Sequence, residues 1–402
     1  MKVIVLNLPA CNINWLGAYG NEWIRTPHLD RLAGEGVVFD QHHSTNPDPE
    51  AVERTWHTGD YQLPGSTRPA IDRLSLFERH GVPFQRISDA PIDGAEIAES
   101  GEIVDVVLDA VAEVSEQPSW LIWVDAHRLL PPWDIFDELF EEYTNSWIPP
   151  QSFDEIPDLE PIPDPDEGPF DVKDVIGREE LQLSFGAVMS ALDLEIGGLI
   201  EEAHERGFDE GVTWIVTSGY GWPLAEHHVI GPVRAEVHEE SVHVPLIIRF
   251  ADGRQSGRRI HALTQTIDLL PTLLRMFEIP ESEWQSPHGR DLSPLITGEV
   301  ETVRDYAFFG SQMGEQVVWG VRTTDWCFQS FPETNVRRLY EKPADRWEMN
   351  DLQQHHLDWC DQLELMRVKF IEIANQPTWT AWPTLPSEET EDDDDSDRAS
   401  GG

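Results

Sequence analysis

Imidazole and carboxylate side chains, which can bind zinc or transfer protons, lie in two groups far apart in the sequence. The groups are His42, His43 and His57 near the N-terminus, and Glu226, His227, His228 and His238 in the second half. Neither group has the His-x-His or His-x-x-x-His spacing typical of a local metal site. Two interpretations remain: a metal site that the fold assembles, or surface and hydrogen-bonded loop histidines. The spacing favours the second.

Three further features could carry chemistry. Tyr220, in the segment TSGYG, would act as a nucleophile or an acid only if a cation lowered its pKa, and Arg234 is the nearest candidate. Asp48 could attack an electrophile, but its segment NPDPE is typical of a turn, which we prefer. The acidic segment 154–167 could bind calcium loosely, yet it lacks the spacing and central glycine of a calcium loop.

The 402-residue chain has a globular composition and is extremely acidic. It is 40% hydrophobic, and 28 basic against 75 acidic residues give a net charge of −47. A field of this sign repels phosphates, which argues against nucleic acid and membranes as partners. No signal peptide and no apolar run of about 20 residues is apparent. Because Cys11, Cys327 and Cys360 show no C-x-x-C spacing, we expect reduced thiols and a cytoplasmic protein.

Apolar patterns predict strands that alternate with helices. The expected strands are 2–8, 37–43, 119–126, 213–218 and 244–248, and the expected helices are 26–36, 66–81, 101–114, 178–207 and 267–279. This alternation predicts an α/β fold over residues 1–300, with a mainly parallel central sheet flanked by helices on both faces. We expect an acidic, proline-rich loop or lid at 134–172, a small antiparallel α+β subdomain at 301–385 and a disordered acidic tail at 386–402.

Six segments, in order along the chain, resemble motifs of the sulfatase family, within the alkaline phosphatase superfamily. They are LGAYGNEWIRTPHLDRLAGEGVVFD (16–40), AIDRLSLFERHGV (70–82), LIWVDAHRLLPPWD (121–134), TSGYG to EESVHVPLII (217–248), TIDLLPTLLRMFEIP to HGRDLSPLITGE (266–299) and LYEKPADRWEMNDL (339–352). The resemblance implies the family's fold and its activity, the cleavage of sulfate monoesters. It also implies the family's calcium ion on oxygen ligands and its formylglycine nucleophile, made from the Cys or Ser that opens C/S-x-P-x-R.

The family's metal-binding positions have no ligating carboxylates in this chain. Pro9 and Ala10 stand where the family has an Asp–Asp pair, and Gly219 and Tyr220 where it has Asp followed by His or Asn. Hard cations need several carboxylates, and three are missing. We therefore predict no cofactor here, and we expect Tyr220 to fill the former metal pocket.

The family nucleophile is also replaced. Without a gap, Pro49 stands in place of the Cys or Ser, and Glu53 in place of the Arg. A shift by one residue places Arg54 correctly but puts Glu50 at the nucleophile, so it restores nothing. Proline cannot become formylglycine, and the charge of Glu53 would oppose a bound sulfate.

The remaining charged residues of the family are also replaced in this chain. Asp89 and Pro91 replace a Lys and a His, and Leu130 replaces the His of the next motif. His127 is no substitute, because a shift of three residues would break the flanking match. Arg234 is the only replacement that would conserve charge, and it depends on a two-residue gap.

The sequence thus predicts the sulfatase fold without the sulfatase site, and fold alone does not fix function. Our main hypothesis is a catalytically inactive homologue that acts as a binding or regulatory protein for an unknown protein or small molecule. The alternative is a hydrolase of sulfate or phosphate esters that uses a rebuilt metal site.

Overall fold

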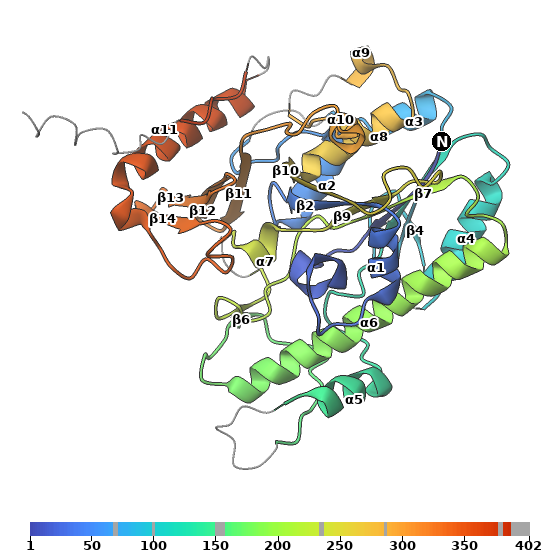
Figure 1. The fold of residues 1–402 in the computed structure, drawn as a ribbon, viewed down its shortest axis with the longest axis horizontal. Coiled ribbons are helices and arrows are strands. Elements are labelled where there is room, and N and C mark those ends of the chain that lie inside the picture. Colours follow the sequence, from blue (N-terminus) through green and yellow to red (C-terminus); the bar gives the residue numbers. More distant parts are fainter. Residues whose placement is uncertain are drawn as a thin grey trace, which may run out of the picture.

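An eight-stranded sheet forms the centre of the molecule (Figure 1). The computed structural model describes residues 1–66, 71–98, 101–148, 157–232, 237–284, 288–376 and 381–386. The strands, in spatial order, are β10 (Arg258–Gln265), β2 (Val37–His43), β9 (Leu246–Arg249), β7 (Val212–Thr217), β1 (Lys2–Asn7), β5 (Trp120–Asp125), β3 (Phe84–Ser88) and β4 (Glu96–Ile97). All neighbours pair in parallel except β9, which is antiparallel to both β2 and β7.

Helices cover both faces of this sheet, as the sequence predicts. One apolar core lies under α1 (Pro27–Gly34), α4 (Ile103–Val114) and the long α6 (Val175–Glu205), and α5 (Asp137–Ser146) packs against α6. The opposite core lies under helices α2 (Pro49–Thr58), α3 (Ser75–Arg79), α8 (Leu269–Met276), α9 (Glu281–Trp284) and α10 (Ser293–Thr297). The central strands β1, β5 and β7 are mostly apolar because both of their faces are buried, and polar side chains such as Asn7 and Asp125 stand at their ends.

A second, four-stranded antiparallel sheet follows the main sheet in the chain. It consists of β11 (Ala307–Met313), β12 (Gln316–Arg322), β13 (Trp326–Phe331) and β14 (Val336–Glu341), and α11 (Leu357–Ala374) packs across it (Figure 1). This sheet confirms the antiparallel architecture predicted for the C-terminal part. The short α7 (Glu239–Val242) and the two-stranded pair β6 (Gly168–Pro169) and β8 (Val229–Ile230) lie near the junction with it.

Several predicted elements need correction. In the predicted helix 66–81, only Ser75–Arg79 is helical within the described residues. The expected loop 134–172 contains α5, whose Phe140 and Tyr143 are buried. Strands β3 and β10 and helix α2 were not predicted. Of the acidic tail, residues 387–402 lie outside the described residues.

Helix α6 also corrects the expectation about apolar segments. It is long and apolar enough to span a membrane by length and composition, the one such helix among the described residues. In the fold, 78% of its most apolar window is buried against the sheet and α5. Burial inside the protein accounts for its composition.

Candidate functional site

The loops after β1 and β7 meet at one edge of the central sheet. These strands are parallel neighbours, so their carboxyl ends deliver residues 9–10 and 219–220 to the same place. An isolated bridge joins Ala10 to Gly221, and the Trp222 amide donates to the Ala10 carbonyl at 3.2 Å. The structure therefore brings together four positions at which the sequence resemblance expects a metal.

The space beside Gly219 is filled by α2. A Cβ atom built on Gly219 would lie 2.2 Å from Cγ1 of Val52 and 2.9 Å from Cη2 of Trp56. Real Cβ atoms do not approach other atoms so closely, so no larger residue fits without a shift. Pro9 and Ala10 are buried and carry no side-chain oxygen. These residues do not fit a calcium ion.

Tyr220 belongs to the apolar packing at this edge. Its side chain is 7% exposed and lies in the same core cluster as Val52 and Trp56. Burial raises the pKa of Tyr220 well above its ordinary value, and the charges of Asp48 and Asp125 raise it further. A phenol of this kind stays neutral, which is the opposite of what an activated nucleophile requires.

Helix α2 begins at Pro49, where the sequence resemblance expects the family nucleophile. Asp48 is its N-cap, with Oδ1 accepting a hydrogen bond from the Ala51 amide at 2.8 Å, and Pro49 is the first helical residue. The interpretation of Asp48 as a simple turn residue is therefore wrong, although its carboxylate is structural. Pro49 is exposed at the start of the helix.

A buried arginine that the sequence interpretation missed neutralises Glu53. Arg86 on β3 donates through Nε to Asp125 at 2.7 Å and through both terminal nitrogens to Glu53, one of them at 2.8 Å. Burial would raise the pKa of Glu53, but the hydrogen bonds from Arg86 and His57 outweigh it and lower the pKa to about 2. Asp125 also accepts hydrogen bonds from Asn7 at 2.7 Å and from an indole N–H.

Asp89, Pro91 and Leu130, the other replaced positions that the structure describes, have separate surroundings. Asp89 accepts from the His127 backbone amide at 2.8 Å and pairs with its imidazole at 2.9 Å, so His127 is held by a carboxylate. Pro91 is exposed, and Leu130 packs partly buried between the two apolar cores. Arg234 lies outside the described residues.

The candidate zinc ligands are divided among different partners. His42 Nδ1 lies 2.9 Å from Thr264 Oγ1, His57 pairs with Glu53, His227 stacks on His238 at 3.8 Å, and His43 stacks on His243 at 4.3 Å. Glu226 accepts from the Leu224 amide, and His228 is exposed. Among the described residues, no three His, Cys, Asp or Glu side chains are placed to hold a metal ion.

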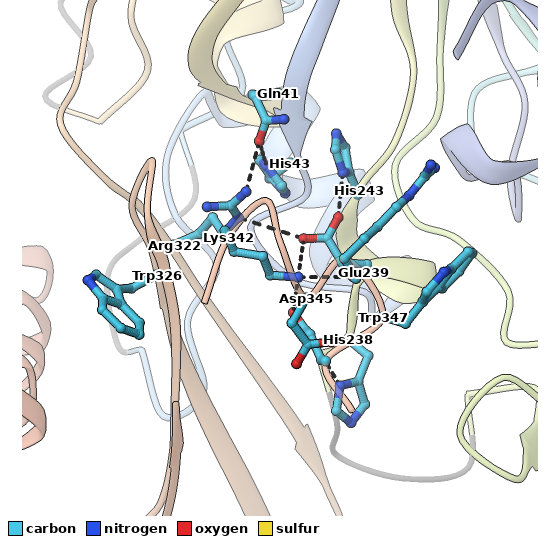
Figure 2. A network of polar contacts seen from close by, with 12 residues as sticks. Gln41, His43, His238, Glu239, His243, Arg322, Trp326, Lys342, Asp345 and Trp347 are labelled. Atoms are coloured by element: carbon cyan, nitrogen blue, oxygen red, sulfur yellow. Dashed lines mark hydrogen bonds and ion pairs between the residues drawn. The ribbon is translucent and has the colours of Figure 1, made fainter. Parts of the chain in front are cut away.

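A buried ionic network joins α7 to the second sheet (Figure 2). Glu239 pairs with His243 at 2.5 Å and with Lys342 at 3.0 Å, and Arg322 Nε lies 3.6 Å from its carboxylate. Lys342 also pairs with Glu348 at 3.0 Å. We call these five residues the junction network.

The junction network is electrostatically balanced. Burial alone would raise the pKa of Glu239, but His243, Lys342 and Arg322 hold it well below its usual range. Burial likewise opposes the charge of Lys342, and Glu239 and Glu348 outweigh it and raise the pKa of Lys342. The network links elements about 100 residues apart, so local sequence patterns do not indicate it. The motif EES before a buried strand indicated α7, but it did not indicate the partners of Glu239 in the second sheet.

A small cavity lies next to the start of α2. Its volume is about 130 Å³, and its walls include Asp48, Pro49, His227, His238 and Glu240. His227 pairs with Glu240 at 2.5 Å. The carboxylates of Asp48 and Glu240 therefore belong to the lining of this cavity, next to Pro49.

Two family models match the chain. The sulfatase model matches residues 140–279, and a model of the C-terminal part of N-sulphoglucosamine sulphohydrolase matches residues 234–369. Both matches lie beyond the segments that carry Pro9, Ala10 and Pro49.

Curated relatives match shorter stretches. An N-acetylglucosamine-6-O-sulfatase of Bacteroides thetaiotaomicron is 28% identical over 177 residues, which cover 41% of this chain and 31% of that protein. An ulvan-active sulfatase of Formosa agariphila is 30% identical over 184 residues, covering 44% and 35%. The chain thus spans about a third of the length of these relatives.

Solved structures match over almost the whole chain. A protein in complex with its substrate D-glucosamine-2-N,6-O-disulfate has a TM-score of 0.71 at 17% identity, covering 91% of this chain and 96% of that one. The phosphonate monoester hydrolase of Agrobacterium radiobacter has a TM-score of 0.71 at 16% identity, covering 91% and 95%. At this identity the likeness shows the fold alone.

Proposed function

We propose that the chain, which resembles sulfatases in sequence and in fold, has lost sulfatase chemistry and acts as a binding or regulatory protein. The observation that carries this proposal is the packing of Val52 and Trp56 against Gly219. An apolar contact occupies the position at which a ligating carboxylate would have to stand. A carboxylate at position 219 would therefore disturb the packing of the apolar core.

The electrostatics of the site support the same conclusion. All three nitrogens of the Arg86 guanidinium donate to Glu53 or Asp125. The guanidinium of Arg86 therefore binds two carboxylates and has no N–H group left to neutralise the charge of a sulfate ester. The adjacent cavity presents the carboxylates of Asp48 and Glu240, which would repel an anionic ester.

Steady-state assays of the full chain with 4-nitrophenyl sulfate and 4-nitrophenyl phosphate test the proposal. We expect no turnover above a mock purification, either without metal or with Ca²⁺, Mn²⁺ or Zn²⁺. Turnover that depends on a metal, and that is lost in Tyr220→Phe or Glu53→Ala, would refute it. Such a result would favour the rebuilt hydrolase site.

Thermal unfolding gives an independent test of metal binding. An ion that binds only the folded protein stabilises it by about 2.7 kcal/mol at 100 times its Kd. We expect equal midpoints with millimolar Ca²⁺, Zn²⁺ or Mn²⁺ and with matched ionic strength of NaCl. A saturable rise with one divalent ion would contradict the proposed loss of the metal site.

A further inference from the structure

A larger cavity lies where the second sheet meets the main domain. Its volume is about 380 Å³, within the range of roughly 300–1,000 Å³ common for ligand pockets. One wall comes from the loop after β1, with Trp15 and Trp23, and another from Gln182 on α6. Arg346 and Trp347, on the loop after β14, close the opposite side. Junctions between structural units are preferred places for ligand sites.

The junction network holds this last wall in place. Lys342 and Glu348 stand on either side of Trp347 in the chain, and both are buried ion-pair partners. In Figure 2 the Trp347 indole lies on the opposite side of the network from Trp326. The Trp347 carbonyl also lies 3.0 Å from His227 Nε2. The aromatic wall is thus fixed before any ligand arrives, which lowers the entropic cost of binding.

The cavity offers large aromatic surfaces to solvent. Trp23 is 38% exposed and Trp347 44% exposed, whereas Trp15 is buried at 6%. The rings of Trp15 and Trp23 lie 6.4 Å apart at 56°, so they form two faces of a corner. Tryptophan faces supply much apolar contact area, and tryptophan is enriched at binding interfaces.

Polar groups at the cavity have capacity for a ligand. Among the described residues, neither the Gln182 amide nor the indole N–H of Trp23 or Trp347 has a hydrogen-bond partner. An amide can both donate and accept, as a hydroxyl group requires. Arg346 is committed in part, because it donates to Asn14 Oδ1 and lies over the Trp347 ring at 5.2 Å.

The charges at the cavity cancel. Arg346 and Glu22 contribute one charge of each sign. Burial, together with the charge of Glu240, raises the pKa of Glu226 to about 8, so this carboxyl is mostly protonated at neutral pH. Neither an anion nor an organic cation is favoured by such a lining.

We propose that this cavity binds a neutral saccharide unit. The C–H face of a sugar ring would pack on Trp23 or Trp347, and its hydroxyl groups would pair with Gln182, the indole N–H groups and Arg346. This inference goes beyond the proposed function and concerns a different cavity from the one beside α2, so sulfatase assays do not decide it.

Saturation-transfer NMR and calorimetry of the full chain test the proposal. The probes are the methyl glycosides of D-glucose, D-galactose, D-mannose and N-acetyl-D-glucosamine, with cellobiose, glucose 6-sulfate and choline as comparison ligands. We expect a neutral sugar to bind saturably with Kd below ~10 mM, a modest affinity. Trp23→Ala and Trp347→Ala should each weaken binding about tenfold or more, because each removes a stacking surface.

Met349→Ala is the matched control, since Met349 is 68% exposed, lies two residues from Trp347 and does not line the cavity. It should leave sugar affinity unchanged. Urea unfolding of the two tryptophan variants checks that the fold is intact. The proposal would be overturned if no neutral sugar bound saturably, or if only choline or glucose 6-sulfate bound. It would also be overturned if both folded tryptophan variants bound the sugar as tightly as the parent protein does.

Discussion

Replacing Gly219 with aspartate should destabilise the protein rather than create a metal ligand. The new Cβ would start 2.2 Å from Val52 Cγ1. Val52 lies in α2, where a β-branched side chain has one strongly preferred rotamer, so it cannot swing aside cheaply. Overpacking of this kind costs about 1–3 kcal/mol.

The carboxylate adds a second cost. It would enter a cluster that contains Trp56 and Tyr220, where the charges that act on Tyr220 are the carboxylates of Asp48 and Asp125, and an unpaired buried charge costs about 3 kcal/mol or more. We therefore expect Gly219→Asp to lower the free energy of unfolding by about 4–6 kcal/mol. Gly219→Ala isolates the steric part and should lower it by about 1–3 kcal/mol.

Urea denaturation at pH 7, with and without 10-fold excess Ca²⁺ over protein, measures both variants. In a Val52→Ala background the cost of Gly219→Ala should be smaller, because the methyl group at 2.2 Å is gone and only the 2.9 Å contact with Trp56 Cη2 remains. The reasoning fails if Gly219→Asp is as stable as the parent, or if Ca²⁺ restores its stability. Either result would mean that the loop still accommodates a ligand carboxylate.

Arg86→Met should lower the free energy of unfolding by about 3 kcal/mol, because Asp125 stays buried without its cation; an unchanged urea midpoint would contradict this. Lys342→Met should cost about 3–5 kcal/mol, and full stability in differential scanning calorimetry would show that the network is not essential. Burial, then nearby positive charge, lowers the pKa of His42 to about 3. As the pH falls below 6.5, His42 takes up a proton in the unfolded chain but not in the folded protein. The free energy of unfolding should therefore fall by up to about 1.4 kcal/mol per pH unit, and His42→Gln should flatten this slope. Glu226 has the opposite sign: its folded pKa of about 8 exceeds the unfolded value, so stability is lost as pH rises from 4.5 to 8. Glu226→Gln should then gain on the order of 1–2 kcal/mol relative to the parent between pH 5 and 8, and a parallel pH profile would refute this.

The fold was largely predictable because its central strands carry strong local signals. β1 and β7 are apolar runs rich in β-branched residues, and their burial on both faces follows directly. β10 lacks such a run, with Arg258, Arg259 and His261 among its first four residues, so its place beside β2 depends on tertiary pairing. Helix α2 was missed because Asp and Pro favour turns and helix starts equally well.

The sequence predicted where the candidate site lies in the fold, but it did not predict which side chains pack there. Parallel strands place their carboxyl ends at one edge, so the meeting of residues 9–10 with 219–220 followed from topology. The packing of Val52 and Trp56 against Gly219 could not be predicted, because neither residue is near Gly219 in the sequence. The charge of Glu53 was predicted without its partner, since nothing in the sequence around Arg86 indicates a buried cation.

The junction network also constrains the order in which the chain can fold. The ribosome adds Glu239 to the chain about 100 residues before Lys342, its buried ammonium partner. Arg322 also follows Glu239 in the chain. During synthesis α7 must therefore remain hydrated or incompletely packed until β14 has formed, since a buried glutamate without its cations is costly. We therefore expect α7 to reach its final packing only after the second sheet has docked, although His243 can pair with Glu239 earlier.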